Sequence, residues 1–249
     1  SLYRPNRFGT GEVYVGPSNI TDVLGGEEFR DGLWITVKYL IYTVPTGLVL
    51  GLLLALVAHR RLRGIKAFQA IFASTVATSV AVAAVVFFGL VNPKIGKFGQ
   101  VSFIDLSKSD SALRGVSLTS IWQNIGLTFV IVLAGLQAVP DQLMEAAQLD
   151  GFGPVRRLFK VTLPLISPTL LFLVVVLMIF GFQAFAPMEI LTNGDPAGST
   201  ETLVFKIFNR QGPSLISEGS VMALGLFGLT FVVTLIQLTI LNRRVHYGE

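Results

Sequence analysis

Five long runs without a single Asp, Glu, Lys or Arg constrain the fold of this sequence more than any other feature. They cover residues 39–58, 67–93, 115–140, 161–188 and 219–242. A helix needs about 20 apolar residues to cross roughly 30 Å of hydrocarbon, so each run is long enough to span a bilayer. The alternative, a soluble protein with five buried core helices, fails because the sequence has no amphipathic helices to cover them.

The composition excludes several other classes of protein. Only 14% of the residues are charged and 52% are hydrophobic, whereas soluble domains carry about 25% charged residues. The absence of cysteine excludes disulfides and thiol nucleophiles, and two histidines, His59 and His246, are too few for a histidine-rich metal site. No basic run or aromatic-studded basic stripe is present, so we expect no nucleic-acid partner.

We therefore predict an all-α polytopic membrane protein with five transmembrane helices in one domain that covers residues 1–249. The predicted spans are about 36–58, 67–91, 117–138, 165–188 and 219–242. Gly47 and Gly51 form a small-xxx-small pair that lets helices approach closely, either for plain packing or for sliding between moving helices. Pro45 is expected to kink or break the first span.

Basic residues in the loops predict the orientation of the chain. Nine Lys and Arg lie within the 40 residues of one set of loops, whereas the other set has nine in 90 residues. The dense set should be cytoplasmic, and it comprises 59–66, 139–163 and 243–249. This orientation places Ser1 outside and the C-terminus inside. We expect a sixth span upstream of Ser1, with a cleaved signal peptide as the alternative.

The loop 139–163 has the signals of two short helices joined by a turn. Pro140 can start the first helix and Gly151 can end it in the left-handed conformation. Pro154 starts the second helix, which Pro164 is expected to stop. From the residues alone, such an elbow either receives a partner groove or lies on the lipid surface.

The same loop resembles the EAA loop of permease subunits of binding-protein-dependent ABC importers. Glu145-Ala146-Ala147 is followed by Gly151 and then by Val161-Thr-Leu-Pro164 at the family spacing, with Val161 where the family has Ile. The resemblance implies that these residues couple the chain to an ATPase. The implied coupling residues are Pro140, Glu145, Ala146, Ala147, Asp150, Gly151, Gly153, Val161, Leu163 and Pro164.

A second resemblance concerns an outer loop. Thr192-Asn-Gly-Asp195-Pro196 and Thr200-Glu-Thr-Leu203 are similar to the T-x-G-G-P … T-x-T-L pattern in the first permease of heterodimeric sugar importers. Asp195 replaces the second glycine, which leaves the local turn geometry open. Residues 120–124, 153–157 and 159–160 look most like the UgpA type of permease, from importers of glycerol-3-phosphate or glycerophosphodiesters.

The resemblance implies a type I ABC importer permease in the bacterial cytoplasmic membrane. The implied partners are a second homologous permease, two cytoplasmic ATPase subunits, an extracytoplasmic substrate-binding protein and membrane lipid. The sequence lacks the G-x-x-x-x-G-K-[S/T] loop that cradles nucleotide phosphates, so ATP and Mg²⁺ should bind to the ATPase and no cofactor to this subunit. The polar segments 1–33, 92–117 and 189–219 should contact the binding protein, with plain solvated linkage as the alternative.

Candidate substrate-path residues are polar or aromatic residues in or next to the spans, namely Gln123, Asn124, Phe182, Gln183 and Phe185. The alternative is that each polar group bonds a neighbouring helix. None of the five runs contains Lys or Arg, so an uncharged sugar such as a disaccharide stays open as the substrate. A secondary transporter or channel is the alternative of another class, but the sequence shows neither ionisable groups within the runs nor a clear internal repeat.

Overall fold

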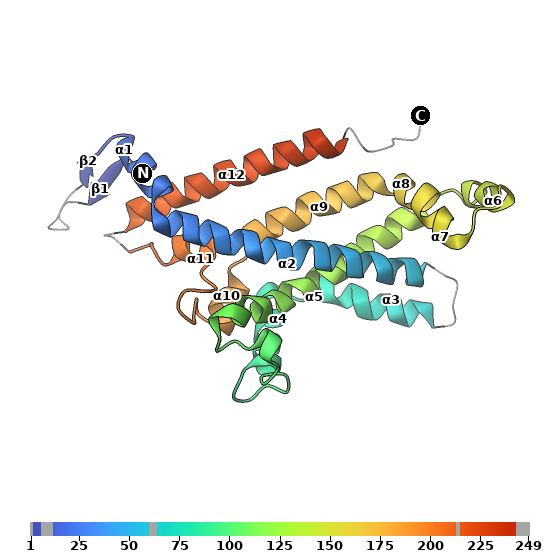
Figure 1. Cartoon of the computed structure of the whole chain (residues 1–249), viewed down its shortest axis with the longest axis horizontal. Helices are drawn as coiled ribbons and strands as arrows, with labels where there is room; N and C mark the ends of the chain where they lie inside the picture. The colour runs from blue at the N-terminus through green and yellow to red at the C-terminus, as the bar shows by residue number, and fades with distance from the viewer. Residues whose placement is uncertain (1, 6–11, 60–63, 213–214, 243–249) are drawn as a thin grey trace. The chain divides into compact units, whose positions relative to one another are not determined.

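The computed structural model describes residues 2–5, 12–59, 64–212 and 215–242 (Figure 1). Residues 60–63 of the loop predicted to be cytoplasmic, and the C-terminal residues 243–249, lie outside the described residues. One antiparallel hairpin precedes the helices and pairs Tyr3 with Tyr14. The elements are β1 (Tyr3–Pro5), β2 (Glu12–Tyr14), α1 (Ser18–Gly25), α2 (Glu27–Ala58), α3 (Ile65–Ser74), η1 (Thr75–Ala77), α4 (Val80–Val91), η2 (Ser102–Ile104), α5 (Ser109–Gln137), α6 (Asp141–Leu149), α7 (Pro154–Arg157), η3 (Leu158–Thr162), α8 (Leu163–Leu165), α9 (Ser167–Phe182), α10 (Ala186–Leu191), α11 (Leu203–Phe208) and α12 (Ile216–Asn242).

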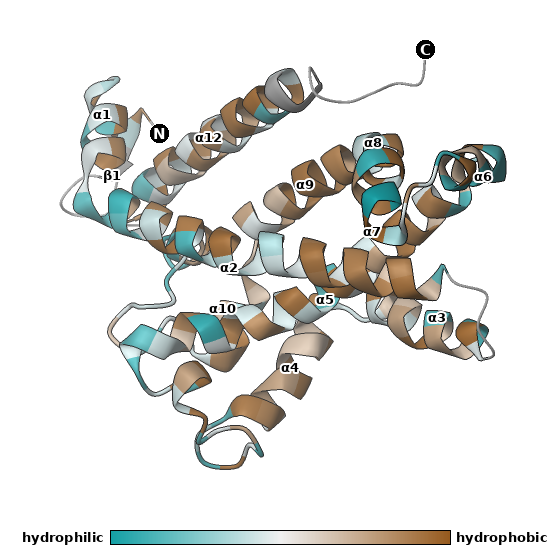
Figure 2. Cartoon of the chain, turned by 45° about the vertical axis from the view of Figure 1, so that its right-hand side comes forward, coloured by the Kyte–Doolittle hydropathy of each residue, from teal (hydrophilic) through white to brown (hydrophobic). Residues whose placement is uncertain are grey.

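The chain is predominantly helical, as predicted, and the hairpin is a small addition to the all-α class. In the described part of the chain, α2, α5 and α12 are long and apolar enough to cross a membrane. Two bent helix pairs pass the same test if each is counted as one span, which gives three to five spans. Figure 2 shows that α4 and α9, which belong to these pairs, are largely hydrophobic. The count of five stays a prediction.

The structure differs from the predicted spans at three places. The helix expected over 67–91 is interrupted after η1, where Thr78 is extended. Ser74 and Thr75 donate their hydroxyls to backbone carbonyls of the preceding turn, a competition that weakens helices. The helix expected over 165–188 ends at Phe182, and a new helix begins before Pro187. By contrast, α2 stays one helix through Pro45, so the chain does not break there, and the kink stays a prediction.

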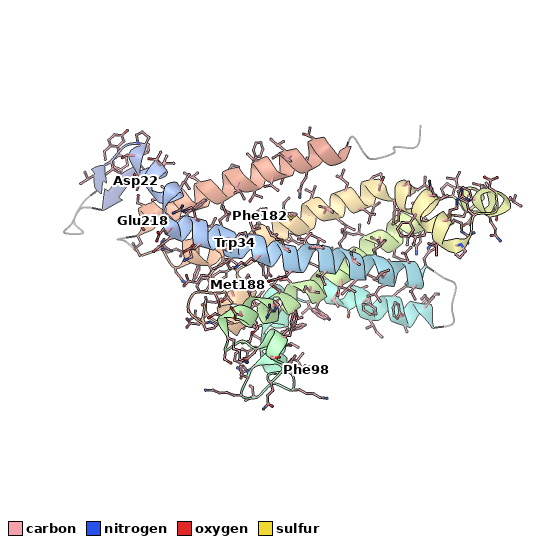
Figure 3. All side chains as sticks on the ribbon, in the orientation of Figure 1. Asp22, Trp34, Phe98, Phe182, Met188 and Glu218 are labelled. Carbon is pink, nitrogen blue, oxygen red and sulfur yellow. The ribbon has the colours of Figure 1, made fainter. Side chains whose placement is uncertain are left out.

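The chain divides into two compact units. The first comprises residues 1–43, 80–120 and 179–233. Its core packs α4 against α10 around the fully buried Tyr39 and Met188, the latter labelled in Figure 3. Tyr39 donates its phenol to the Ser120 hydroxyl at 2.5 Å. The N-terminal hairpin joins this unit through Ser217, which donates to the Tyr3 carbonyl and accepts from the Asn19 amide.

The second unit comprises residues 44–79, 121–178 and 234–249. Phe129 lies at the centre of its core, against Phe68 and Phe72 of α3. Here α2 and α5 cross closely. A Cβ added at Gly47 would stand 2.4 Å from Asn124 Cβ, and one added at Gly51 would stand 2.5 Å from Thr128 Cβ. The small-xxx-small pair therefore packs helices, as the sequence predicted.

Candidate functional site

The predicted elbow is formed by α6, α7, η3 and α8 in the second unit. Pro140 is the N-cap of α6 in an extended conformation, and Asp141 occupies its first turn, where a negative charge favours the helix dipole. At the other end Gly151 is left-handed, with φ +76°. The Gly151 amide donates to the Gln148 carbonyl and the Phe152 amide to the Ala147 carbonyl. These two bonds form a Schellman cap, so both predicted ends of the first helix are confirmed.

The second helix of the elbow begins at Pro154, as predicted, but does not stop at Pro164. It continues as the π-helix η3 and then α8, and it ends at Leu165. The proline ring has no N–H and clashes with the carbonyl four residues earlier, and a wider π turn relieves that clash. The bend of 68° before α9 then falls at Ile166.

The inner face of α6 packs against the second helix of the elbow. Ala147 is buried, and Thr162 donates its hydroxyl to the Met144 sulfur at 3.8 Å. On the rim, Arg157 donates to the Gln148 side chain at 3.2 Å. The resemblance names Ala146 and Ala147 alike as coupling residues. In the structure Ala147 points into the elbow and only Ala146 is exposed.

Several exposed side chains of the elbow are large and apolar. Leu149 is 89% exposed, Val155 68% and Phe159 64%, and Leu143 is also exposed. Ala146 lies between Leu143 and Leu149 along α6 at a spacing of three residues, so the three share one side of the helix. We call Leu143, Ala146, Leu149, Val155 and Phe159 the elbow patch. Sequence reasoning singled out only Ala146 of this set, although the three-residue spacing was a usable signal.

The other coupling residues hold or flank the patch. Glu145 and Asp150 are exposed beside it, and Gly153 is the extended N-cap of α7. Val161, Leu163 and Pro164 are half-buried, and Leu163 packs against the hydrophobic core of the second unit. Exposed apolar groups of this density are typical of a surface that receives a partner. Figure 2 shows hydrophilic and hydrophobic residues side by side on α6.

The candidate substrate-path residues fall into two groups in different units. In the second unit Gln123 donates its side-chain amide to the Thr78 carbonyl at 3.0 Å, and Asn124 is buried at the crossing with α2. This hydrogen bond to another segment of the chain fits the alternative given above, that a polar side chain within a span serves packing and does not line a substrate path. The interrupted helix leaves the Thr78 carbonyl without its usual donor, and the glutamine supplies one.

In the first unit the candidates lie at the end of α9. Phe182, labelled in Figure 3, is buried, whereas Gln183 is exposed. The Phe185 ring is half-buried and packs against Phe205 and Phe208, with centroids 6.1 and 4.5 Å apart. Phe185 is therefore committed to local packing, and Gln183 remains the accessible polar group of the three.

The outer loop over residues 192–202 is held by its own threonines. The hydroxyls of Thr192 and Thr200 lie 2.7 Å apart, and Thr202 donates to the Ala184 carbonyl. Gly194 is left-handed with φ +88°, and a Cβ there would stand 2.8 Å from the Phe205 ring. Asp195 is absent from the positive-φ positions of the loop, so the replacement of the family glycine leaves the turn intact.

Charged residues also fix other segments of the first unit. Arg210 forms ion pairs with Glu28 of α2 and with Glu218 of α12. In the segment after η2, hydrogen bonds from the Ser107 hydroxyl and amide lower the pKa of Asp105 to about 2, and Lys108 adds to this effect. Residues 95–103 carry exposed apolar side chains, including Phe98, which is labelled in Figure 3.

The sequence matches a known family of transport proteins. Residues 47–247 match the family model described as "Binding-protein-dependent transport system inner membrane component". The sn-glycerol-3-phosphate transport system permease protein UgpA of Shigella flexneri is 31% identical over 256 residues, which cover 99% of this chain and 86% of that protein. The protein of the same name from Yersinia pestis is 34% identical over 249 residues, which cover 96% and 84%.

Solved structures show the same fold. A bacterial ABC transporter involved in import of the acidic polysaccharide alginate gives a TM-score of 0.76 at 19% identity, covering 92% of this chain and 84% of that chain. An amino acid ABC transporter gives a TM-score of 0.58 at 19% identity, covering 86% and 91%. The fold is that of the type I ABC importer permeases, and the chain belongs to the family of binding-protein-dependent transport system inner membrane components.

Proposed function

We propose that this chain forms, with a second permease, the translocation path for glycerol-3-phosphate or glycerophosphodiesters, and that α6 couples the path to a cytoplasmic ATPase. The observation that carries the coupling role is the elbow patch, an exposed apolar surface on a helix fixed at both ends by caps. A rigid, exposed apolar surface transmits motion when a partner groove closes over it. Closure of the ATPase dimer then moves the spans between inward-facing and outward-facing states.

The proposed assembly contains one copy of this chain, a second homologous permease and two ATPase subunits that bind ATP and Mg²⁺. In this assembly the elbow and the C-terminus lie on the cytoplasmic side, which the density of basic residues in their loops supports. The outer segments then face an extracytoplasmic binding protein. Support for such a partner comes from a related alginate transporter, which was solved in complex with a periplasmic protein and gives a TM-score of 0.74 at 22% identity.

The substrate is inferred from the names of the UgpA relatives. An uncharged sugar is the second candidate, because none of the five charge-free runs offers a Lys or Arg to a phosphate. Import assays in proteoliposomes with glycerol-3-phosphate, glycerophosphocholine and trehalose separate the two. Uptake of trehalose alone would contradict the glycerophosphate assignment.

The coupling role is tested with Ala146→Trp in the reconstituted complex. Ala146 is exposed at the middle of the elbow patch, so an indole there leaves the elbow folded but props a docking groove open. Substrate-stimulated ATP hydrolysis should be lost. The matched control is Ala70→Trp, the same change at an exposed alanine of α3, which should retain stimulation. Wild-type coupling in Ala146→Trp would contradict the docking role of α6.

A further inference from the structure

A cleft of about 470 Å³ opens on the first unit, apart from the substrate-path candidates and the elbow. Its walls come from one face of α2, the first turn of α5 and the outer loop with the start of α11. All of these segments belong to the first unit. The volume lies within the range of about 300–1,000 Å³ that is usual for small-molecule sites.

The face of α2 that lines the cleft is polar and aromatic. Asp31, Trp34, Lys38 and Tyr42 are spaced by three or four residues and so share one side of the helix. The Trp34 side chain, labelled in Figure 3, is 58% exposed. The Lys38 ammonium lies 5.2 Å from the centroid of the Trp34 ring. The face thus offers an exposed indole with a cation held over its ring.

The opposite wall adds hydrogen-bond acceptors and an ion pair. Asp110 and Ser109 come from the first turn of α5. Lys206 pairs with Glu201 at 2.9 Å, so these two charges cancel. Within the described residues, neither Asp31 nor Asp110 forms an ion pair. Both carboxylates are therefore free to accept hydrogen bonds from a ligand.

We infer that this cleft binds the polyhydroxylated carbon skeleton of the transported compound, a sugar or glycerol unit, on its arrival at the permease. A hydroxyl-rich ligand has donors for Asp31 and Asp110, an acceptor for Lys38 and a C–H face for the Trp34 indole. Two free carboxylates against one free ammonium leave one net negative charge, which disfavours a ligand that is only an anion. This inference rests on the proposed import function, which identifies the bound ligand with the transported compound.

The test uses Trp34 as its own reporter. The chain has two tryptophans, so Trp122→Phe leaves Trp34 as the only tryptophan of this chain, and the same complex with Trp34→Phe added gives the background emission of the other subunits, which is subtracted. The reconstituted complex, without binding protein and without nucleotide, is titrated with trehalose, glycerophosphocholine, glycerol-3-phosphate and inorganic phosphate. A saturable change in Trp34 emission is expected with a hydroxylated ligand, with a Kd on the order of 1 mM, and none with inorganic phosphate. The compound that gives a saturable change shows whether the cleft binds a sugar or a glycerol unit.

The variant Asp110→Asn should weaken that binding about tenfold, because a charge-assisted hydrogen bond is lost. The matched control is Glu27→Gln, which removes one carboxylate from the exposed first turn of α2 outside the cleft and should leave the Kd unchanged. Retained assembly and basal ATP hydrolysis establish that the variants are folded. An unchanged Kd in Asp110→Asn, an equal response to inorganic phosphate, or no response to any hydroxylated ligand would overturn the inference.

Uptake assays show whether the cleft inference or the proposed import function is the one that fails. If the cleft binds no hydroxylated ligand but the full complex still imports one, the inference is wrong and the import function stands. If the cleft binds such a ligand while the full complex with ATP imports none, the cleft assignment stands and the import function is wrong.

Discussion

The elbow and the outer loop 192–202 both carry a sequence motif, but they are built in opposite ways. The elbow is fixed by backbone caps at Pro140 and Gly151, and it leaves apolar side chains exposed. The outer loop satisfies its own polar groups through Thr192, Thr200 and Thr202, and it packs its glycine against a buried ring.

This difference separates a surface that leaves apolar side chains uncovered from a loop that pairs its own polar groups. An exposed leucine contributes nothing to folding until another surface covers it. A buried turn, in contrast, contributes to folding and little to association. Substitutions in the outer loop should therefore change stability, and substitutions in the elbow patch should change coupling.

The largest expected effect is that of Gly194→Ala. The left-handed backbone and the clash with the Phe205 ring together should cost about 2–4 kcal/mol of unfolding free energy. The matched change, Gly151→Ala, meets nothing within 4 Å and should cost only about 1 kcal/mol. Thermal unfolding of the two purified variants measures the difference. Equal losses would mean that the outer loop is not the rigid scaffold described here.

Arg210→Ala should destabilise the first unit by about 1–2 kcal/mol. The side chain is 13% exposed and pairs with two glutamates that are partly solvated, so the loss is smaller than for a fully buried pair. Thermal unfolding at low and at 1 M salt measures it. The loss should shrink at high salt because the pairs are screened. A salt-independent loss would point to packing of the arginine stem instead.

Leu149→Ser should weaken assembly with the ATPase about tenfold, because one apolar contact is lost on docking. Its effect on unfolding of the free permease should stay below about 0.5 kcal/mol, since the side chain is 89% exposed. Co-purification against ATPase concentration and thermal unfolding provide the two readouts. A variant that unfolds early while assembly is normal would reverse the comparison.

The smallest effect concerns pH. The pKa of Asp105 lies at about 2, below its ordinary value near 4. Its contribution to stability is therefore present above about pH 4 and is lost as pH falls toward 2. The difference in melting temperature between Asp105→Asn and wild type should be constant from pH 5 to pH 8. A difference that changes within that window would contradict the shifted pKa.

The sequence predicted the helical class and the caps of the elbow because these follow from local chemistry. Charge-free runs fix helix positions in lipid, and Pro140 and Gly151 act through their own backbone. The resemblance named Ala146 and Ala147 alike, although the spacing of Leu143, Ala146 and Leu149 by three residues groups only Ala146 with these two leucines. In the structure Ala147 is buried, and the neighbouring Met144 contacts Thr162.

The interruption after η1 and the role of Gln123 were also beyond the sequence. Hydropathy treats residues 67–91 as one run, whereas the hydroxyls of Ser74 and Thr75 act on the backbone. Once the helix breaks, the Thr78 carbonyl needs a donor, and Gln123 provides it from α5. The pattern of apolar residues does not predict such a long-range hydrogen bond.

The most direct test of the central claim is the burial of Leu149 by the ATPase. The chain contains no cysteine, so Leu149→Cys gives a unique site for an environment-sensitive fluorophore, with Phe98→Cys as the matched control on an exposed outer residue. Assembly with the ATPase should shift the emission at position 149 to the blue and protect it from an aqueous quencher, while position 98 stays unchanged. Full quencher access at position 149 in a complex that still couples ATP hydrolysis to substrate would contradict the docking of the elbow patch.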